Sequence, residues 1–172
     1  MLTRAGSDVV LPYKLARQNG RWQGRLALAG FERVRELVSA ASEDVAVEVA
    51  LDFCRDDEGR CRVQGRAAVS TAVECGRCLK PQPCRVDVAI DLCVVGTEEQ
   101  ASAVSAAVDP YVLSGEEVRI TDLVEDDLIL GLPNQVCTQG DDCPNRPPYT
   151  YGEADGEAGA KERNNPLRRL PS

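Results

Sequence analysis

Hydrophobic and polar residues alternate most clearly between residues 44 and 95. Three successive stretches place mostly apolar side chains at every second position, and these stretches are 45–53, 61–75 and 84–94. Such alternation is typical of strands that bury one face and expose the other. The pattern therefore predicts a three-stranded antiparallel meander from Asp44 to Val95 at the centre of the fold.

Helical spacing of apolar residues appears on both sides of this segment. Residues 31–40 carry apolar side chains three and four positions apart, with charged residues between them. Residues 121–131 repeat the pattern, start at a capping Thr121-Asp122 pair and are followed by Pro133. We expect two short amphipathic helices that cover the inner face of the sheet. The predicted fold class is α+β, an antiparallel sheet built on the meander with two helices.

Residues 11–28 contain Asn19-Gly20, a strong signal for a tight β-hairpin. A two-residue loop there would place alternate apolar residues of both arms on one face. Pro12 would suit only an edge strand, because it has no N–H to donate. The segment is predicted as a hairpin.

The chain of 172 residues is long enough for one domain with a tail. We place the domain at residues 1–144. Residues 145–172 are rich in Pro, Gly, Glu, Arg and Asn and have few apolar side chains, which is typical of a disordered segment.

Composition narrows the cellular setting. Aromatic residues make up 4% of the chain and hydrophobic residues 43%, so the core should be aliphatic. No apolar run approaches the roughly 20 residues that cross a bilayer, and residues 1–10 lack the apolar core of a signal peptide. We expect a cytoplasmic protein with no membrane partner.

The chain has eight cysteines and no histidine. Structural disulfides are rare in a reducing compartment, so metal binding, catalysis or burial remain for these thiols. Without histidine, the usual general base and the Cys-His and Ser-His nucleophile pairs are excluded. Glycine-rich phosphate-binding motifs are also absent from the sequence. These features favour a non-enzymatic protein.

Two cysteine pairs lie in predicted turns, Cys75 with Cys78 at the tip of the second hairpin and Cys137 with Cys143 near the end of the domain. Together they could form a closed four-thiolate site for a structural zinc ion. Strand parity also places Cys84 opposite Cys75, so Cys84 is an alternative ligand.

Two other interpretations of the thiols stay open. Cys75 and Cys78 could be a catalytic dithiol, with Arg77 lowering a thiol pKa, although redox motifs of this kind usually begin a helix. The cysteines could also be unligated and act as small apolar residues, the interpretation that suits Cys54, Cys61 and Cys93.

The net charge is −8, and the acidic excess lies within residues 31–143. This charge argues against non-specific binding to nucleic acid, DNA included, because such binding needs neutralisation of phosphates. Five basic residues nevertheless gather on one face and one end of the meander, and these candidates for phosphate contacts are Arg62, Arg66, Arg77, Lys80 and Arg85. The alternative is that they only offset nearby acidic residues, such as Asp87 and Asp91.

The order of these features resembles one protein family. The segment Glu74-Cys75-Gly76-Arg77-Cys78-Leu79-Lys80-Pro81, the acidic helix from Val124 to Pro133 and the terminal Asn165-Pro166-Leu167-Arg168-Arg169-Leu170 are together similar to the YceD family, the large ribosomal RNA subunit accumulation proteins. The resemblance runs from about Gly30 to the end. Gly131 is a departure, because a better helix former is expected there.

The resemblance implies a role in the synthesis, processing or stability of 23S rRNA, with no catalytic residues. It implies 23S rRNA or a large-subunit ribosomal protein as partner. We expect Glu125, Asp126 and Asp127 to be exposed on their helix. They are candidates for a docking face for a basic ribosomal protein, and the alternative is a helix face that is only solvated. The alternatives are a cytosolic dithiol oxidoreductase that uses Cys75 and Cys78, and a zinc-stabilised adaptor that binds only proteins.

Overall fold

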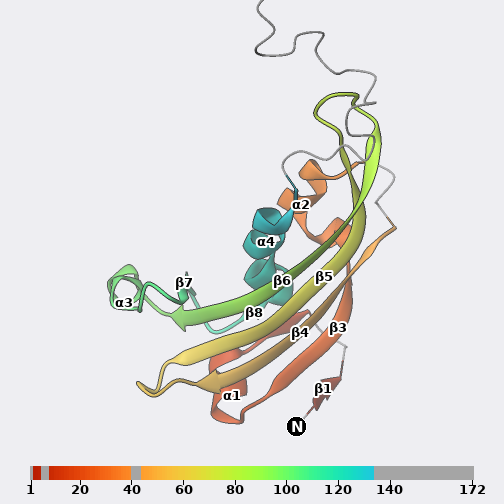
Figure 1. The fold of residues 1–172 in the computed structure, drawn as a ribbon. Helices are drawn as coiled ribbons and strands as arrows, with labels where there is room; N and C mark the ends of the chain where they lie inside the picture. The colour runs from red at the N-terminus through yellow and green to blue at the C-terminus, as the bar shows by residue number, and fades with distance from the viewer. Residues whose placement is uncertain (1, 5–7, 40–43, 134–172) are drawn as a thin grey trace, which may run out of the picture.

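The structure is a computed structural model that describes residues 2–4, 8–39 and 44–133. These residues form a curved, mostly antiparallel sheet of six strands with short helices packed against it (Figure 1). The predicted α+β class is confirmed. The proposed domain boundary at residue 144 and the tail lie outside the described residues.

The strands are β1 (Leu2–Arg4), β2 (Val9–Val10), β3 (Arg21–Ala27), β4 (Ala46–Arg55), β5 (Cys61–Glu74), β6 (Pro81–Val95), β7 (Asp109–Val112) and β8 (Val118–Arg119). The helices are α1 (Pro12–Arg17), α2 (Glu32–Leu37), α3 (Glu98–Ser102) and α4 (Ile120–Gly131), with a 3-10 turn η1 (Leu28–Gly30). The sheet order is β1-β3-β4-β5-β6-β7, and its two outermost pairs are parallel. β2 and β8 form a separate antiparallel pair.

The alternation seen in the sequence decides which side chains enter the core. Odd-numbered residues of β4 and β5, such as Val49 and Val63, are buried, while even-numbered neighbours such as Glu48 and Gln64 are exposed. In β6 the even-numbered residues turn inward, as Val86 and Ile90 do. The core is aliphatic, and its few aromatic members are Trp22, Phe31 and Phe53.

The predicted hairpin over residues 11–28 is wrong. Pro12 begins helix α1. The first residue of a helix has no carbonyl partner within the helix for its N–H, so proline loses no hydrogen bond there, and its fixed φ suits the first turn. Asn19 adopts a positive φ of 43°, and the N–H of Gly20 donates to the Leu15 carbonyl oxygen at 2.9 Å. Asn19-Gly20 therefore ends a helix, and β3 pairs with β4 instead.

Both helices predicted to cover the sheet are present, although α2 is shorter than expected. α4 approaches β6 very closely at Gly131. A Cβ atom there would lie 2.5 Å from Cγ1 of Val88 and 2.9 Å from Cγ1 of Val86. Packing therefore explains why Gly131 stands where a better helix former was expected, because only a residue without a side chain allows this approach.

The β5–β6 hairpin extends beyond the rest of the sheet. β4 pairs with β5 only as far as Ala68, whereas β5 and β6 stay paired to Glu74 and Pro81. We call residues 69–86 the distal arm, its Cys75–Lys80 turn the tip, and the paired residues 61–68 and 87–95 the root. The arm projects past the end of β4, as Figure 1 shows. Its middle is anchored by Ser39, whose backbone N–H donates to the Ala72 carbonyl oxygen at 2.9 Å.

Candidate nucleic-acid interface and metal centre

The tip folds the two cysteines into a tight turn. The N–H of Leu79 donates to the Cys75 carbonyl oxygen at 2.9 Å, and the N–H of Cys75 donates to the Lys80 carbonyl oxygen at 3.0 Å. Leu79 adopts a positive φ of 55°, which closes the turn. The N–H of Arg77 donates to Sγ of Cys75 at 3.4 Å. This donor points at a sulfur that would bind a metal ion as a thiolate.

The donor chemistry of this turn fits half of a tetrahedral zinc site. Cys75 is 1% exposed and Cys78 is half-buried, so water is largely excluded from the first thiol. Within the described ranges, no group of three or more Cys, Asp or Glu side chains is arranged to hold a metal ion. Cys137 and Cys143 lie outside the described residues, so the four-cysteine site stays a prediction.

Cys84 does not lie opposite Cys75, which corrects the expected pairing. The register places Cys84 across from Thr71 and ends at the Glu74–Pro81 pair. Strand parity was right, since both cysteines are on the same face, but the offset was wrong by four residues. At about 3.3 Å per residue, this moves Cys84 roughly 13 Å down the arm from the Cys75 position.

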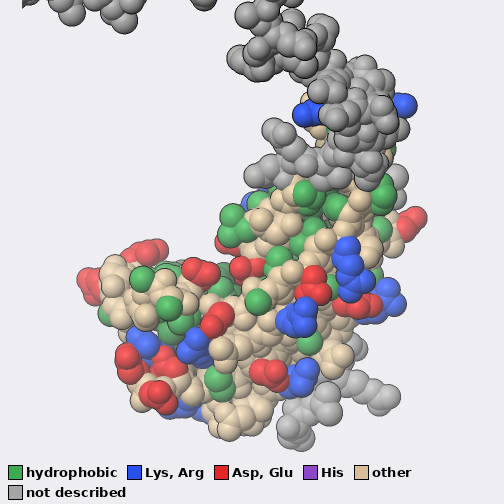
Figure 2. All heavy atoms as spheres, viewed as in Figure 1, with side chains coloured by type: hydrophobic (Ala, Val, Ile, Leu, Met, Phe, Trp, Pro, Cys, Tyr) green, Lys and Arg blue, Asp and Glu red, His purple; other side chains and the backbone are tan. Residues whose placement is uncertain are grey.

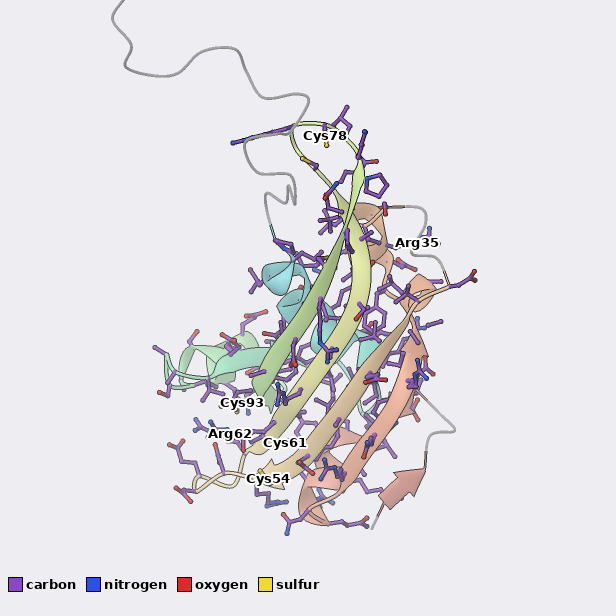
Figure 3. The ribbon with its side chains drawn as sticks, turned by 45° about the vertical axis from the view of Figure 1, so that its right-hand side comes forward. Arg35, Cys54, Cys61, Arg62, Cys78 and Cys93 are labelled. Atoms are coloured by element: carbon purple, nitrogen blue, oxygen red, sulfur yellow. The ribbon has the colours of Figure 1, made fainter. Side chains whose placement is uncertain are left out.

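Three further thiols lie at the other end of the hairpin. Figure 3 shows Cys54, Cys61 and Cys93 near Arg62 at the root, far from Cys78. Burial raises the pKa of Cys61 to about 12 and also raises the pKa of Cys93. A buried thiol with a raised pKa is neutral and unreactive at physiological pH. Cys61 and Cys93 therefore act as small apolar residues.

The five basic candidates divide into two groups. At the root, Arg62 donates two hydrogen bonds of 2.7 Å to Asp91, and Arg66 binds Asp87 at 2.9 Å. Neither pair is directly opposite across the strands, because Arg62 faces Cys93 and Asp91 faces Gln64. These two arginines are already neutralised by neighbouring carboxylates.

Arg77, Lys80 and Arg85 form the second group, towards the tip. Their side chains make no ion pair or hydrogen bond with any other described residue. Lys80 and Arg85 are exposed. An exposed arginine or lysine without a protein carboxylate beside it is available to an external anion such as phosphate.

The same kind of pairing continues across the outer face of the sheet, where sequence reasoning had not placed a site. Arg21 lies 3.6 Å from Asp52, and Arg25 lies 3.8 Å from Glu48. Between the Arg25–Glu48 and Arg66–Asp87 pairs is an open hollow of about 400 Å³ above small side chains such as Gly24, Ala50 and Ala68. Figure 2 shows basic and acidic side chains intermixed over the surface in view. The cross-strand positions of opposite charges were the signal that could have identified these pairs.

The acidic helix differs from its prediction at Glu125. This side chain was expected to be exposed, but the residue is only 8% exposed. Its Oε1 accepts hydrogen bonds from the N–H of Arg33 at 2.8 Å and of Val34 at 3.4 Å, and Oε2 accepts one from Nε of Arg33 at 3.1 Å. Glu125 therefore caps the first turn of α2 and is not available to a partner.

The two following carboxylates remain nearer to solvent. Asp126 is exposed and pairs with Arg33 at 2.6 Å. Asp127 is half-buried, and burial, followed by the charges of Asp109 and Asp126, raises the pKa of its carboxyl. A cation placed beside Asp127 would relieve this repulsion.

The fold and the site together define an α+β domain with a projecting, cysteine-tipped hairpin. Residues 63–171 match the YceD family, described as large ribosomal RNA subunit accumulation protein YceD. The chain therefore belongs to the YceD family, and membership associates it with accumulation of large-subunit ribosomal RNA. The match begins in β5, not near Gly30 as the resemblance suggested.

No solved structure matches the chain. Among the helices in the described ranges, none is long and apolar enough to cross a membrane.

Proposed function

We propose that this protein is a non-enzymatic accessory factor in assembly of the large ribosomal subunit. It acts in the cytoplasm and supports the synthesis, processing or stability of 23S rRNA. The observation that carries the proposal is membership of the YceD family over residues 63–171, which includes the arm, the tip and α4.

The contact with rRNA is made by the tip and the adjoining arm. Arg77, Lys80 and Arg85 have no carboxylate partner among the described residues, whereas Arg62 and Arg66 are held by Asp91 and Asp87. Phosphate contacts supply most of the electrostatic affinity for RNA and are made by exposed cations of this kind. The separation of the tip from the acidic body reduces repulsion of the phosphate backbone.

The tip is stiffened by a structural zinc ion held by Cys75, Cys78, Cys137 and Cys143. A zinc ion in a closed thiolate site supplies folding stability and no open position for catalysis. Metal analysis of protein purified without chelator should find one zinc per chain, and Cys78→Ser should remove it. Zinc lost in this variant would exclude a free catalytic dithiol, the competing function, whereas metal-free wild-type protein would contradict the zinc site.

Asp126 and Asp127 form the part of α4 that docks a basic ribosomal protein. Glu125 supports this face indirectly, because it fixes α2 beside α4 through Arg33 and Val34.

The test of the rRNA function is depletion of the protein, followed by measurement of 23S relative to 16S rRNA. We expect the ratio to fall, and an unchanged ratio would overturn the proposal. Complementation should then separate the two basic groups. A variant with Arg77, Lys80 and Arg85 changed to Ala should fail to restore the ratio, and a matched variant with Arg62 and Arg66 changed to Ala should restore it.

A further inference from the structure

We propose that the free edge of β6, between Pro83 and Asp91, binds an extended basic segment of another protein as an added β-strand. This inference rests on the proposed function, since it specifies how a basic partner docks beside α4. It is carried by the direction of the β6 backbone, the limits of the free edge and the side chains beside it.

The hydrogen bonds of the arm show which way the β6 backbone points. The carbonyl oxygen of Ala72 accepts from the N–H of Ser39, so it points away from β6. Ala72 faces Pro83, and this pair is therefore a non-hydrogen-bonded pair of the antiparallel ladder. The backbone groups of Pro83 and of residues with the same parity must then point away from β5.

The other end of β6 agrees with this direction. The carbonyl oxygen of Val95 accepts from the N–H of Leu113 at 2.8 Å, on the side away from β5. Arg85, Asp87 and Ala89 share this parity, and β7 pairs with β6 only from Leu92 onward. Their backbone N–H and C=O groups consequently have no strand partner in the part of the chain that the structure describes.

The free edge is limited at both ends. Towards the tip, Pro81 and Pro83 have no N–H to offer, and prolines of this kind protect an edge from pairing. Towards the root, β7 already occupies the position beside Leu92. The window between them is residues 84–91, so an added strand of about seven residues would continue the line of β7.

An apolar side chain lies beside this window. Leu130 of α4 is 83% exposed, the largest exposure of any large apolar residue in the described ranges. At 100° per residue, Leu130 is on the side of α4 opposite Glu125, which faces α2. The contact of Gly131 with Val86 and Val88 places this end of the helix against β6. Apolar side chains on one face of an added strand would cover Leu130 and the half-buried Val88.

The charges select a basic occupant. Asp127 lies on the same side of α4 as Leu130 and is close enough to Asp109, at the start of β7, for that charge to raise its pKa. Neither Asp109 nor Asp127 has a described cationic partner. Arg85 projects from the outer face of β6, away from α4. A lysine or arginine on the added strand would therefore meet two unpaired carboxylates.

The test uses the full chain and a fluorescent peptide of about seven residues. Valine and lysine occupy the alternate positions that face α4 and threonine occupies the others, and glutamate replaces lysine in a control peptide. Amide hydrogen exchange of Arg85, Asp87 and Ala89 should slow when the basic peptide is added. Ala89→Pro removes an N–H that points away from β5. Pro81 and Pro83 occupy equivalent positions of β6, so a proline is compatible with the strand there. The variant should weaken binding about tenfold. Ala89→Thr keeps the N–H and is the matched control, expected to bind as the wild type does.

Leu130→Gln gives an independent variant if Ala89→Pro folds poorly, and it should weaken binding about fivefold because it removes apolar contact from an exposed position without adding a charge. Equal binding by all variants, or protection of other amides, would overturn the proposal. Faster exchange at the three amides after truncation at residue 144 would identify the chain's own tail as occupant, and protection that depends on protein concentration would identify a second copy. Either result also overturns it.

Failure of this proposal is distinguishable from failure of the rRNA function. The variant with Arg77 and Lys80 changed to Ala should keep peptide binding, and Ala89→Pro should keep binding of RNA to the tip.

Discussion

The two ends of the β5–β6 hairpin use the same residue types in opposite ways. At the root, Arg62 is bound by Asp91 through two hydrogen bonds, and Cys61 and Cys93 are buried and neutral. At the tip, Arg77 and Lys80 have no described ion-pair partner, and two cysteines share one turn. Basic residues and thiols therefore indicate a binding site only where the neighbouring strand leaves them available. We therefore assign stability to the root and the proposed RNA and zinc contacts to the tip.

The largest expected effect comes from the glycines of the two ends. A Cβ atom on Gly65 at the root would collide with the carbonyl oxygen of Ala50 and lie 2.9 Å from Cα of Leu51. Because both are backbone atoms, Gly65→Ala should cost about 3 kcal/mol or more of unfolding free energy, or prevent folding. Gly76 at the tip has no atom within 4 Å of such a Cβ. Gly76→Ala should change stability by less than about 0.5 kcal/mol in urea denaturation. Similar losses for both variants would contradict the assignment of stability to the root.

Thiol reactivity should separate the two ends next. At pH 8, with the pKa of Cys61 at about 12, only about one Cys61 thiol in 10⁴ is ionised. In metal-free native protein, Cys78 should be alkylated at least about a hundredfold faster than Cys61, as measured by mass spectrometry of peptides. Added zinc should slow alkylation of Cys78 and leave Cys61 unchanged. Equal rates at the two cysteines would show that the root thiols are more accessible than their burial indicates.

RNA affinity should depend on the basic residues towards the tip and not on those at the root. Changing Arg77, Lys80 and Arg85 to Ala should weaken binding to 23S rRNA fragments about tenfold and reduce the slope of log K against log salt by about 2. Changing Arg62 and Arg66 to Ala should leave that slope unchanged, because their charges are already balanced by Asp91 and Asp87. Filter binding at salt concentrations from about 50 to about 300 mM would measure both the affinity and its salt dependence. A reduced slope for the root variant would mean that RNA displaces the carboxylates.

The smallest effect concerns pH. Hydrogen bonds from Arg62 hold the pKa of Asp91 below its usual range, despite some burial. This pairing stabilises the fold above the unfolded-state pKa of about 3.9 and is lost as the pH falls through the lower folded-state value. Asp91→Asn should therefore flatten the dependence of unfolding free energy on pH below about pH 4, by less than about 1 kcal/mol because the pair is partly exposed. Arg85→Ala is the control and should leave the pH dependence unchanged.

Much of the fold followed from local patterns. Alternation identified β4, β5 and β6 and the residues that they bury, since a strand with one wet face has period two. Asn19-Gly20 misled the prediction because the same pair ends a helix as readily as it turns a hairpin. The choice depended on Pro12, which begins α1, and on β4, which is remote in sequence and pairs with β3.

The site was harder to predict because it depends on distances between elements. Parity placed Cys84 on the correct face, but the length of the tip turn set the register and moved Cys84 opposite Thr71. The prolines of β6 concealed the last residue pairs of the β5–β6 ladder, since proline is unusual in paired strands unless its missing N–H would point outward. For Glu125, the pattern identified a polar position on a helix, but only packing could bring the N-terminus of α2 to it.

The hydrogen bond between Ser39 and Ala72 determines how the arm behaves as a mechanical element. Ser39 follows α2, whose first turn is held by Glu125 of α4, so the middle of the arm is connected through two helices to the core. The hydroxyl of Ser39 also donates to the same carbonyl oxygen at 3.2 Å. The arm is consequently fixed to the core at its middle and does not move as an independent hairpin. Its inner half belongs to the cooperative unit of the domain, and local opening should be confined to the few residues between Ala72 and the tip.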